Sequence, residues 1–205
     1  MDNTLYTNPE YGQYQIDSLV NKLGELNGFS FGEMKNKVEE TRKDWKLSHN
    51  GKDLSLSNIL TGYGVSMEQN VIWREEIYEP ERFLKADKKL VETLKQLSRH
   101  FLLGIVTNNP VFVACRTLKA LGIENSFSII VGLDTCMVSK PHKKPFQEFL
   151  SLASCECENC VSIGDRYGID LDIPLEMGMG GILVDGVEDV YELPSVMGDN
   201  SQTVR

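Results

Sequence analysis

Two carboxylates follow a mostly apolar run in the last third of this 205-residue chain. Residues 160–163 lead into Gly164 and Asp165, and a second acid, Asp170, stands five positions further on. Carboxylate oxygens suit Mg²⁺, which keeps several waters and takes one or two carboxylates together with phosphate oxygens. The pair therefore predicts a magnesium site, while the alternative is that the two acids only cap a turn and a helix.

A hydroxyl side chain stands at the end of a second apolar run. Residues 101–106 are followed by Thr107 and Asn108. A hydroxyl beside exposed backbone N–H groups can hold a phosphate oxygen without adding charge. We therefore expect Thr107 and Asn108 to bind a substrate phosphate. A structural role is compatible with this one, because Asn109 and Pro110 would serve as the cap and the first turn of a following helix.

Lys140 precedes Pro141 and lies 25 residues before Asp165. A lysine beside a metal and a phosphoryl group would offset the negative charge that gathers there, whereas a lone lysine is otherwise a solvated surface charge. We expect Lys140 to take part in catalysis. The nearby His142 is not expected to do so, because phosphoryl transfer through a carboxylate needs no imidazole at this place.

A fourth pattern, Asp-Asn-Thr-Leu-Tyr, occupies residues 2–6. In their order and spacing, the four patterns resemble the motifs of the haloacid dehalogenase-like (HAD) phosphohydrolases, in the branch that carries a helical cap. The first motif of that family is an apolar strand followed by Asp-x-Asp-x-Thr. The match here begins at the second Asp, which is Asp2, so we expect the strand and the first Asp to lie before Met1.

The resemblance implies a Mg²⁺-dependent phosphatase that acts on a small phosphorylated metabolite. In the family, the first Asp attacks phosphorus and forms an aspartyl-phosphate, and the second is the general acid and then the base. This gives Asp2 the acid–base role and its backbone carbonyl a contact with the metal. The implied catalytic residues are Asp2, Thr107 and Lys140, the implied metal ligands are Asp2, Asp165 and Asp170, and the nucleophile is absent from this chain.

Two alternatives to this interpretation stay open. In a different register, Asp2 is itself the nucleophile and Thr4 occupies the acid–base place, although no strand would then precede the Asp. In a different class of function, the chain is a catalytically inactive relative that binds a metabolite or a protein partner. The truncated register is preferred because it also matches Leu5 and Tyr6. It removes the central strand of the family's core, so the sheet is either completed by residues upstream or rebuilt.

Two regions with different hydrophobic patterns predict the helices and strands that position these residues. From residue 13 to 89 the pattern is helical, and we expect helices over residues 14–26, 53–60 and 66–78. A further helix is expected to begin at Phe31, with Ser30 as its N-cap and Glu33 as the capping-box partner. From residue 87, helices over 90–97, 110–121 and 144–153 alternate with strands over 101–106, 127–131, 160–163 and 181–184. Short buried strands that alternate with helices indicate a parallel sheet covered on both faces.

The predicted fold is therefore a doubly wound α/β core, formed by residues 1–6 and 80–205, with a helical cap inserted at residues 7–79. Ligands of such sheets bind beyond the carboxyl ends of the strands. Every motif named above falls at such an end, and this coincidence supports the site more strongly than any single motif. A cap of this kind closes over the site, excludes water and selects the substrate.

Composition narrows the remaining functions. The net charge of −9 argues against a broad basic face for nucleic acid, and no apolar stretch approaches the roughly 20 residues that span a membrane. No basic-then-apolar signal peptide begins the chain, so a cytoplasmic protein is predicted. Five cysteines, an odd number, indicate reduced thiols. A zinc site at Cys155, Cys157 and Cys160 is disfavoured because the fourth ligand is missing, and the oligomeric state is left open.

Overall fold

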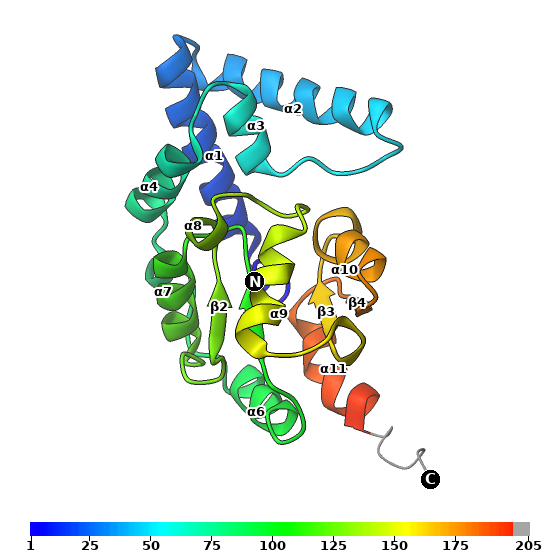
Figure 1. The fold of residues 1–205 in the computed structure, drawn as a ribbon. Helices are drawn as coiled ribbons and strands as arrows, with labels where there is room; N and C mark the ends of the chain where they lie inside the picture. Colours follow the sequence, from blue (N-terminus) through cyan, green and yellow to red (C-terminus); the bar gives the residue numbers. More distant parts are fainter. Residues whose placement is uncertain (199–205) are drawn as a thin grey trace.

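The computed structural model describes residues 1–198 and places a layer of helices above an α/β part (Figure 1). The helical layer consists of α1 (Pro9–Asn27), α2 (Phe31–Ser48), α3 (Leu56–Gly62) and α4 (Met67–Ile77). The α/β part contains the strands β1 (Gly104–Val106), β2 (Ile129–Val131), β3 (Val161–Gly164) and β4 (Gly180–Leu183). Its helices are α5 (Pro80–Phe83), α6 (Lys88–Leu97), α7 (Val111–Leu121), α8 (Leu133–Cys136), α9 (Lys144–Ala153), α10 (Asp172–Glu176) and α11 (Val187–Gly198).

Short polar side chains begin the helices of the helical layer. Asn8 caps α1, Ser55 caps α3 and Ser66 caps α4, and Ser30 forms the predicted capping box with Glu33 at α2. Such caps satisfy backbone N–H groups that have no partner inside the helix. The four predicted helices are confirmed. However, α1 starts earlier and α3 later than predicted, because the caps at Asn8 and Ser55 set their first turns.

The helical layer has a hydrophobic core that continues into the α/β part. Leu23, Met34, Leu60 and Trp73 are buried within the layer, and Val113 of α7 belongs to the same cluster. Burying one such side chain stabilises the fold by about 1.5–3 kcal/mol. The layer is therefore packed onto α7 by apolar contacts, which fixes its position above the ends of the strands.

The strands are parallel, as predicted, but they form two separate pairs. β1 pairs with β2, and β3 pairs with β4. No backbone hydrogen bond of the described residues joins β1 to β3. The N-terminus lies between the two pairs in Figure 1, where residues 2–6 form only a tight turn with an isolated bridge. The predicted sheet is thus present as two halves that are not hydrogen-bonded to each other.

β1 and β2 are shorter than predicted, β3 and β4 keep the predicted length with a shift of one residue, and β4 is exposed. β1 comprises only three residues at the end of the predicted run over 101–106. In β4, Leu183 is 53% exposed, and Gly180 and Gly181 carry no side chain to cover. β4 thus departs from the predicted strands covered on both faces, because its Leu183 side chain reaches solvent.

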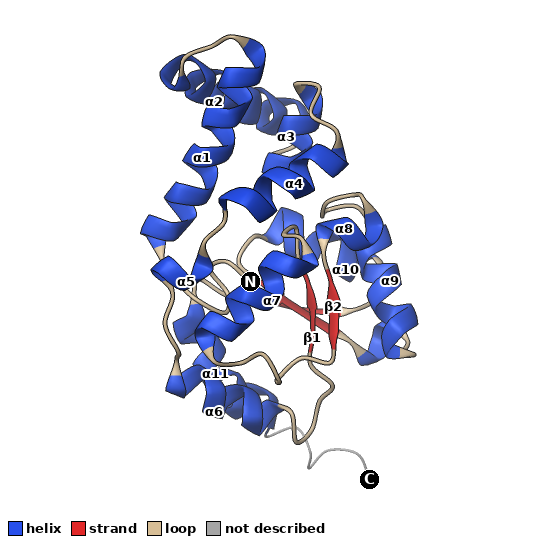
Figure 2. Ribbon diagram, turned by 90° about the vertical axis from the view of Figure 1, so that its left-hand side faces the viewer, coloured by secondary structure: helices blue, strands red, loops and turns tan. Residues whose placement is uncertain are grey.

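A second hydrophobic core holds the α/β part together. It includes Leu94 of α6, Ile105 of β1 and Val190 of α11, and α6 and α11 lie side by side below the strands (Figure 2). Gly122 ends α7 with a φ of 73°, the left-handed conformation expected of a glycine stop. Helices α5, α8, α10 and α11 have no counterpart among the predicted elements.

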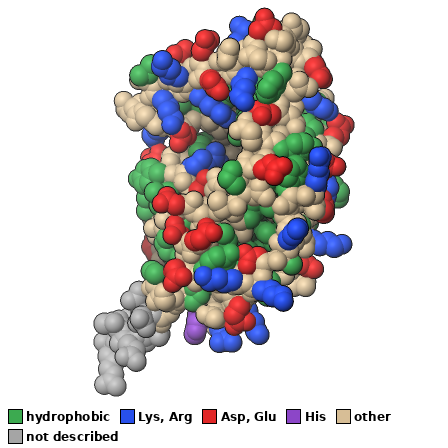
Figure 3. Space-filling view, turned by 180° about the vertical axis from the view of Figure 1, so that it is seen from behind, with side chains coloured by type: hydrophobic (Ala, Val, Ile, Leu, Met, Phe, Trp, Pro, Cys, Tyr) green, Lys and Arg blue, Asp and Glu red, His purple; other side chains and the backbone are tan. Residues whose placement is uncertain are grey.

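The surface carries charges of both signs. On the face shown in Figure 3, basic and acidic side chains are interspersed and are not separated by sign. Within residues 1–198, no helix combines the length and the hydropathy that a bilayer crossing requires.

Candidate active site

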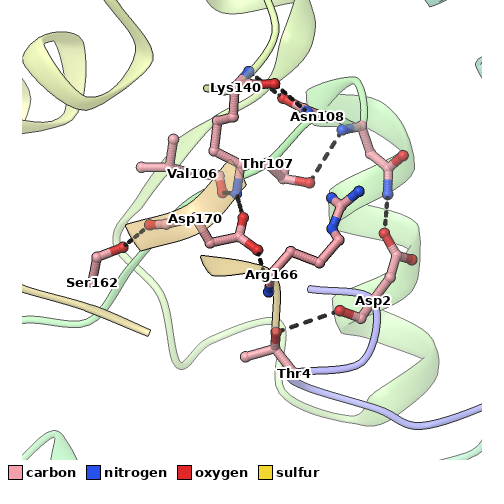
Figure 4. Close-up of polar contacts among 10 residues, drawn as sticks. Asp2, Thr4, Val106, Thr107, Asn108, Lys140, Ser162, Arg166 and Asp170 are labelled. Atoms are coloured by element: carbon pink, nitrogen blue, oxygen red, sulfur yellow. Dashed lines mark hydrogen bonds and ion pairs between the residues drawn. The ribbon is translucent and has the colours of Figure 1, made fainter. Parts of the chain in front are cut away.

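The residues singled out from the sequence meet at one cavity. It measures about 270 Å³ and lies between the helical layer and the ends of β1 and β3. Six of its lining residues are the predicted site residues Asp2, Thr107, Asn108, Lys140, Asp165 and Asp170. Figure 4 shows most of them converging from separate parts of the chain. The structure therefore brings the predicted residues together; their chemical roles stay predictions.

The end of β3 explains why a glycine precedes the first carboxylate. A Cβ on Gly164 would lie 2.4 Å from the Cβ of Asp170, a distance that real side chains do not tolerate. The backbone N–H of Arg166 donates to Oδ2 of Asp170 (3.1 Å), and the Ser162 hydroxyl donates to its carbonyl (2.8 Å). The chain thus folds Asp170 back against the end of the strand, close to Asp165.

Lys140 and Asp170 form a buried ion pair. The Lys140 Nζ lies 2.6 Å from Oδ1 of Asp170, and it also donates to the carbonyl of Val106 at the end of β1 (2.8 Å). Burial opposes ionisation of Asp170, but the Lys140 ammonium and Arg166 together hold its pKa below the usual range. Lys140 therefore joins the ends of β1 and β3, which no backbone hydrogen bond connects.

Asn108 positions the lysine loop. Its side-chain oxygen accepts from the backbone N–H of Lys140 (2.7 Å), and its amide nitrogen donates to the Lys140 carbonyl (3.2 Å). The neighbouring Thr107 hydroxyl accepts from the N–H of Asn109 (3.1 Å) and keeps its own proton free to donate. Asn108 was predicted to bind substrate; here its side chain orients Lys140, and Thr107 is the more available of the two.

Asp2 is held at the base of the cavity. Its carboxylate accepts hydrogen bonds from the Tyr6 hydroxyl and from the amide of Asn109 (3.2 Å for the latter). Burial raises the pKa of Asp2, whereas the Tyr6 hydrogen bond and the charge of Arg166 lower it. The prediction that Asn109 caps α7 is wrong: Pro110 is the cap residue, and the Asn109 side chain is directed to the site instead.

Arg74 is a buried residue of the site that no motif indicated. Its guanidinium donates to Asn70 (2.9 Å), Tyr78 (3.0 Å), Asn109 (3.0 Å) and Ser57 (3.2 Å). It thereby ties α3 and α4 to the residue that orients Asp2. A single arginine inside a charged helix carries no recognisable signal in the sequence, so only the contacts reveal it.

Polar contacts also close the helical layer over the strands. The hydroxyls of Ser55 and Ser139 lie 2.9 Å apart, and Ser139 donates to Asn58 (2.9 Å). At another point of the rim, Lys52 and Asp172 form an ion pair of 2.8 Å. These contacts connect the loop before α3, and α3 itself, to the loop before Lys140 and to α10.

The chain matches a family of known proteins over most of its length. Residues 26–184 fit the family described as haloacid dehalogenase-like hydrolase. This chain belongs to that family. Among curated relatives of this HAD chain, the phosphoglycolate phosphatase of Pectobacterium atrosepticum is 27% identical over 121 residues, which are 50% of this chain and 52% of the relative. Pyrophosphatase PpaX of Bacillus pumilus is 39% identical over 79 residues, 38% of this chain and 37% of the relative.

The match to these relatives is partial, and the likeness to solved structures extends further. The chain spans about half or less of the first curated relatives. A HAD phosphatase from Thermococcus onnurineus superposes with a TM-score of 0.61 at 20% identity, covering 97% of this chain and 95% of that one. YfnB of Bacillus subtilis, a HAD hydrolase, gives 0.58 at 18% identity, with 95% and 96% covered. These likenesses confirm the predicted fold class and carry nothing beyond the fold.

The predicted magnesium ligands of this HAD chain offer only oxygen atoms. Asp165 is half-buried, burial raises its pKa, and it has no ion pair within residues 1–198. Asp170 already faces Lys140. No three His, Cys, Asp or Glu side chains of the described residues gather closely enough to hold a metal on their own. The donor set fits Mg²⁺ only if water, a substrate phosphate or a further carboxylate completes it.

The remaining reactive side chains lie away from the cavity. The Sγ atoms of Cys155 and Cys160 are 3.1 Å apart, next to the 3₁₀ turn Cys157–Asn159. His142 is exposed, and its Nδ1 accepts from the backbone N–H of Lys144 (3.1 Å). None of them lines the HAD site.

Proposed function

We propose that this chain is the greater part of a Mg²⁺-dependent phosphatase that hydrolyses a small phosphorylated metabolite through an aspartyl-phosphate. The observation that carries the proposal is the meeting of all the motif residues, from distant parts of the sequence, around one cavity. The phosphoglycolate phosphatases and the pyrophosphatase among the relatives support phosphoryl chemistry. A volume of about 270 Å³ lies just below the range of about 300–1,000 Å³ typical of pockets for drug-sized ligands, which favours a small substrate.

Thr107 and Lys140 are proposed to bind the phosphoryl group. The Thr107 hydroxyl keeps its proton for a phosphoryl oxygen, since it only accepts from Asn109. The Lys140 ammonium has three N–H donors and uses them on Asp170 and on the carbonyl of Val106, which leaves one for the substrate. Both groups would stabilise negative charge on the transferring group where it develops.

Asp2 is proposed to move the proton. Its carboxylate, oriented by Tyr6 and Asn109, would protonate the leaving oxygen and later accept a proton from the attacking water. Asp165 and Asp170, with the backbone carbonyl of Asp2, would hold Mg²⁺, which when bound polarises the phosphoryl oxygens and offsets their charge.

The nucleophile is proposed to come from a strand between β1 and β3. Each of these strands is paired on one side only, and no backbone hydrogen bond connects them. A strand inserted there would meet the unpaired edge of β1 on one side and that of β3 on the other. Its last residue, directly before Met1, would place an Asp beside Asp2 and Thr107 at the floor of the cavity.

The helical layer is proposed to act as a cap. In this assignment residues 7–79 form the cap, and residues 1–6 and 80–205 form the core. The ion pair between Lys52 and Asp172 supports a layer that closes on the core by a polar contact at its rim, while Ser55 and Ser139 meet in the buried interior. A partly exposed ion pair breaks and reforms at little cost, as substrate entry and product release require.

The test is hydrolysis of p-nitrophenyl phosphate by the chain and by a protein extended upstream in its reading frame. The extended protein is expected to release phosphate only with Mg²⁺, and Asp165→Asn should abolish that activity. Asp185→Asn is the matched control, because Asp185 follows β4 much as Asp165 follows β3 but does not line the cavity.

Two results would overturn the proposal. Activity that survives Asp165→Asn or removal of Mg²⁺ by a chelator would exclude the proposed metal site. No activity in the extended protein on any small phosphate ester would favour the alternative, a catalytically inactive relative that binds a metabolite or a protein partner.

A further inference from the structure

Two arginines reach the cavity from opposite sides. Arg42 comes from α2 of the helical layer, and Arg166 comes from the loop after β3; both line the cavity. Figure 4 shows the Arg166 side chain extending over the site between Asp170 and Asp2. The two guanidinium groups therefore face the same space, one from the proposed cap and one from the core.

The other cations at the cavity are already bound to protein groups. Arg74 donates to four side chains, and Lys140 is paired with Asp170. In contrast, the guanidinium groups of Arg42 and Arg166 have no hydrogen bond or ion pair among residues 1–198. Asp53, in the loop after α2, forms an ion pair of 2.7 Å with Lys46 and not with Arg42. Among the described residues that line the cavity, Arg42 and Arg166 are thus the cations whose side chains keep all their donors for a ligand.

The surroundings of Arg42 favour an anion beside it. Arg42 is half-buried, and burial together with the charge of Arg166 lowers its pKa. Glu39 and Asp53 offset this effect only in part, as weaker contributions. From the core side, Asp2, Asp165 and Asp170 face Arg166, and none of them comes within ion-pair distance of it. Arg166 is exposed and Arg42 is half-buried, and two like charges near each other are stabilised by an anion that contacts both.

We propose that Arg42 and Arg166 bind a second anionic group of the substrate, a carboxylate or a phosphate joined to the transferred phosphoryl group by a short linker. This proposal rests on the proposed function for the place of the phosphoryl group, near Thr107 and Lys140. The planar guanidinium fork matches the two oxygens of a carboxylate or phosphate. The cavity volume of about 270 Å³ leaves room for only a few atoms between the two anions.

Because Arg42 belongs to the helical layer and Arg166 to the core, such a substrate would also hold the two together. A phosphate ester of the same size without a second anion would contact the core alone. The pair therefore selects substrates by charge and links that selection to closure of the layer.

The test compares two probes that differ only in the second anion, 2-phosphoglycolate and 2-hydroxyethyl phosphate. Binding to the chain is measured by calorimetry, and hydrolysis is measured on the upstream-extended protein. 2-Phosphoglycolate is expected to bind about 10- to 100-fold more tightly than 2-hydroxyethyl phosphate, because hydrogen bonds between charged groups are worth about 1.5–3 kcal/mol. Arg42→Gln and Arg166→Gln should each bring that ratio close to one. Inorganic pyrophosphate, as a third probe, distinguishes a phosphate from a carboxylate as the preferred second anion.

Lys43→Gln is the matched control for Arg42→Gln. It removes one positive charge from the next residue of the same helix, where the side chain is exposed and outside the cavity. The ratio between the two probes should stay unchanged in this variant. A fall equal to that of Arg42→Gln would mean that general charge, and not a site, attracts the anion.

The outcomes separate this inference from the proposed function. Selective binding of the acid without Mg²⁺-dependent hydrolysis would leave the anion site standing while the phosphatase proposal fails. Equal affinity for 2-phosphoglycolate and 2-hydroxyethyl phosphate, a ratio unaffected by Arg42→Gln, or no binding of any probe would each overturn the anion site.

Discussion

The buried ion pair between Lys140 and Asp170 should be one of the strongest polar contacts of the site. Its Nζ–Oδ1 distance is 2.6 Å, and its side chains are only 10% and 7% exposed. Lys140→Met keeps the length of the side chain and removes its charge, so a buried carboxylate loses its cationic partner. Breaking a buried pair in this way costs about 3–5 kcal/mol. For a chain of this size the melting temperature should fall by about 6–20 °C.

The control is an ion pair of nearly equal length on the surface. Lys46 and Asp53 are 2.7 Å apart, but their side chains are 54% and 37% exposed. Water screens this pair, so Lys46→Met should cost no more than about 1 kcal/mol. Urea unfolding followed by circular dichroism at neutral pH gives both free energies of unfolding.

Two results would refute this reasoning about burial. The first is a loss of stability in Lys140→Met no greater than in Lys46→Met. The second concerns the double variant Lys140→Met/Asp170→Leu, which should regain part of the loss because no buried charge is left unpaired. A double variant less stable than Lys140→Met alone would contradict the account.

Three further predictions concern local structure. Gly164→Ala should destabilise the chain by about 1–3 kcal/mol, because its Cβ would meet a side-chain carbon 2.4 Å away. Gly168→Ala should be tolerated, because the nearest atom to its Cβ would be 3.5 Å away. Thermal melts of both variants check this. Hydrogen bonds from Arg116 hold the pKa of Glu81 below its usual 4.5. The pair therefore stabilises the fold above pH 4.5 and loses its effect as the pH falls through the lowered pKa of Glu81. Glu81→Gln should thus lower the free energy of unfolding by up to about 1 kcal/mol at neutral pH and leave it unchanged in strong acid. Urea unfolding at both pH values measures this. Ser30→Ala should cost about 0.5–2 kcal/mol through loss of the capping box in the same assay, and an unchanged midpoint would mean that the cap is not formed.

Local patterns in the sequence were enough to predict helices α1–α4, α6, α7 and α9 and the ends of the strands. The capping box at Ser30 and Glu33 is found where it was predicted, and α9 spans the predicted residues 144–153. These features depend on neighbours within a few positions, which a sequence displays directly. The same holds for Thr107 and Asp165, because each directly follows an apolar run that becomes a strand.

The features that the sequence did not predict depend on long-range contacts. Arg74 and Asn109 are 35 residues apart, and nothing near either one indicates that their side chains meet. The division of the sheet into two pairs reflects which strands are neighbours in space, and this is not visible in a run of apolar residues. Arg42 left a weak signal: it lies four positions after the buried Val38, on the inward face of α2.

The coding sequence directly upstream of Met1, read in frame, tests the central claim most directly. The account predicts an apolar run of about five residues, the usual length of a strand, that ends in an Asp immediately before Met1. That segment would fill the place between β1 and β3 and supply the nucleophile beside Asp2. A stop codon at that place, or residues that include neither the apolar run nor the Asp, would contradict the account and favour a binding protein without phosphatase activity.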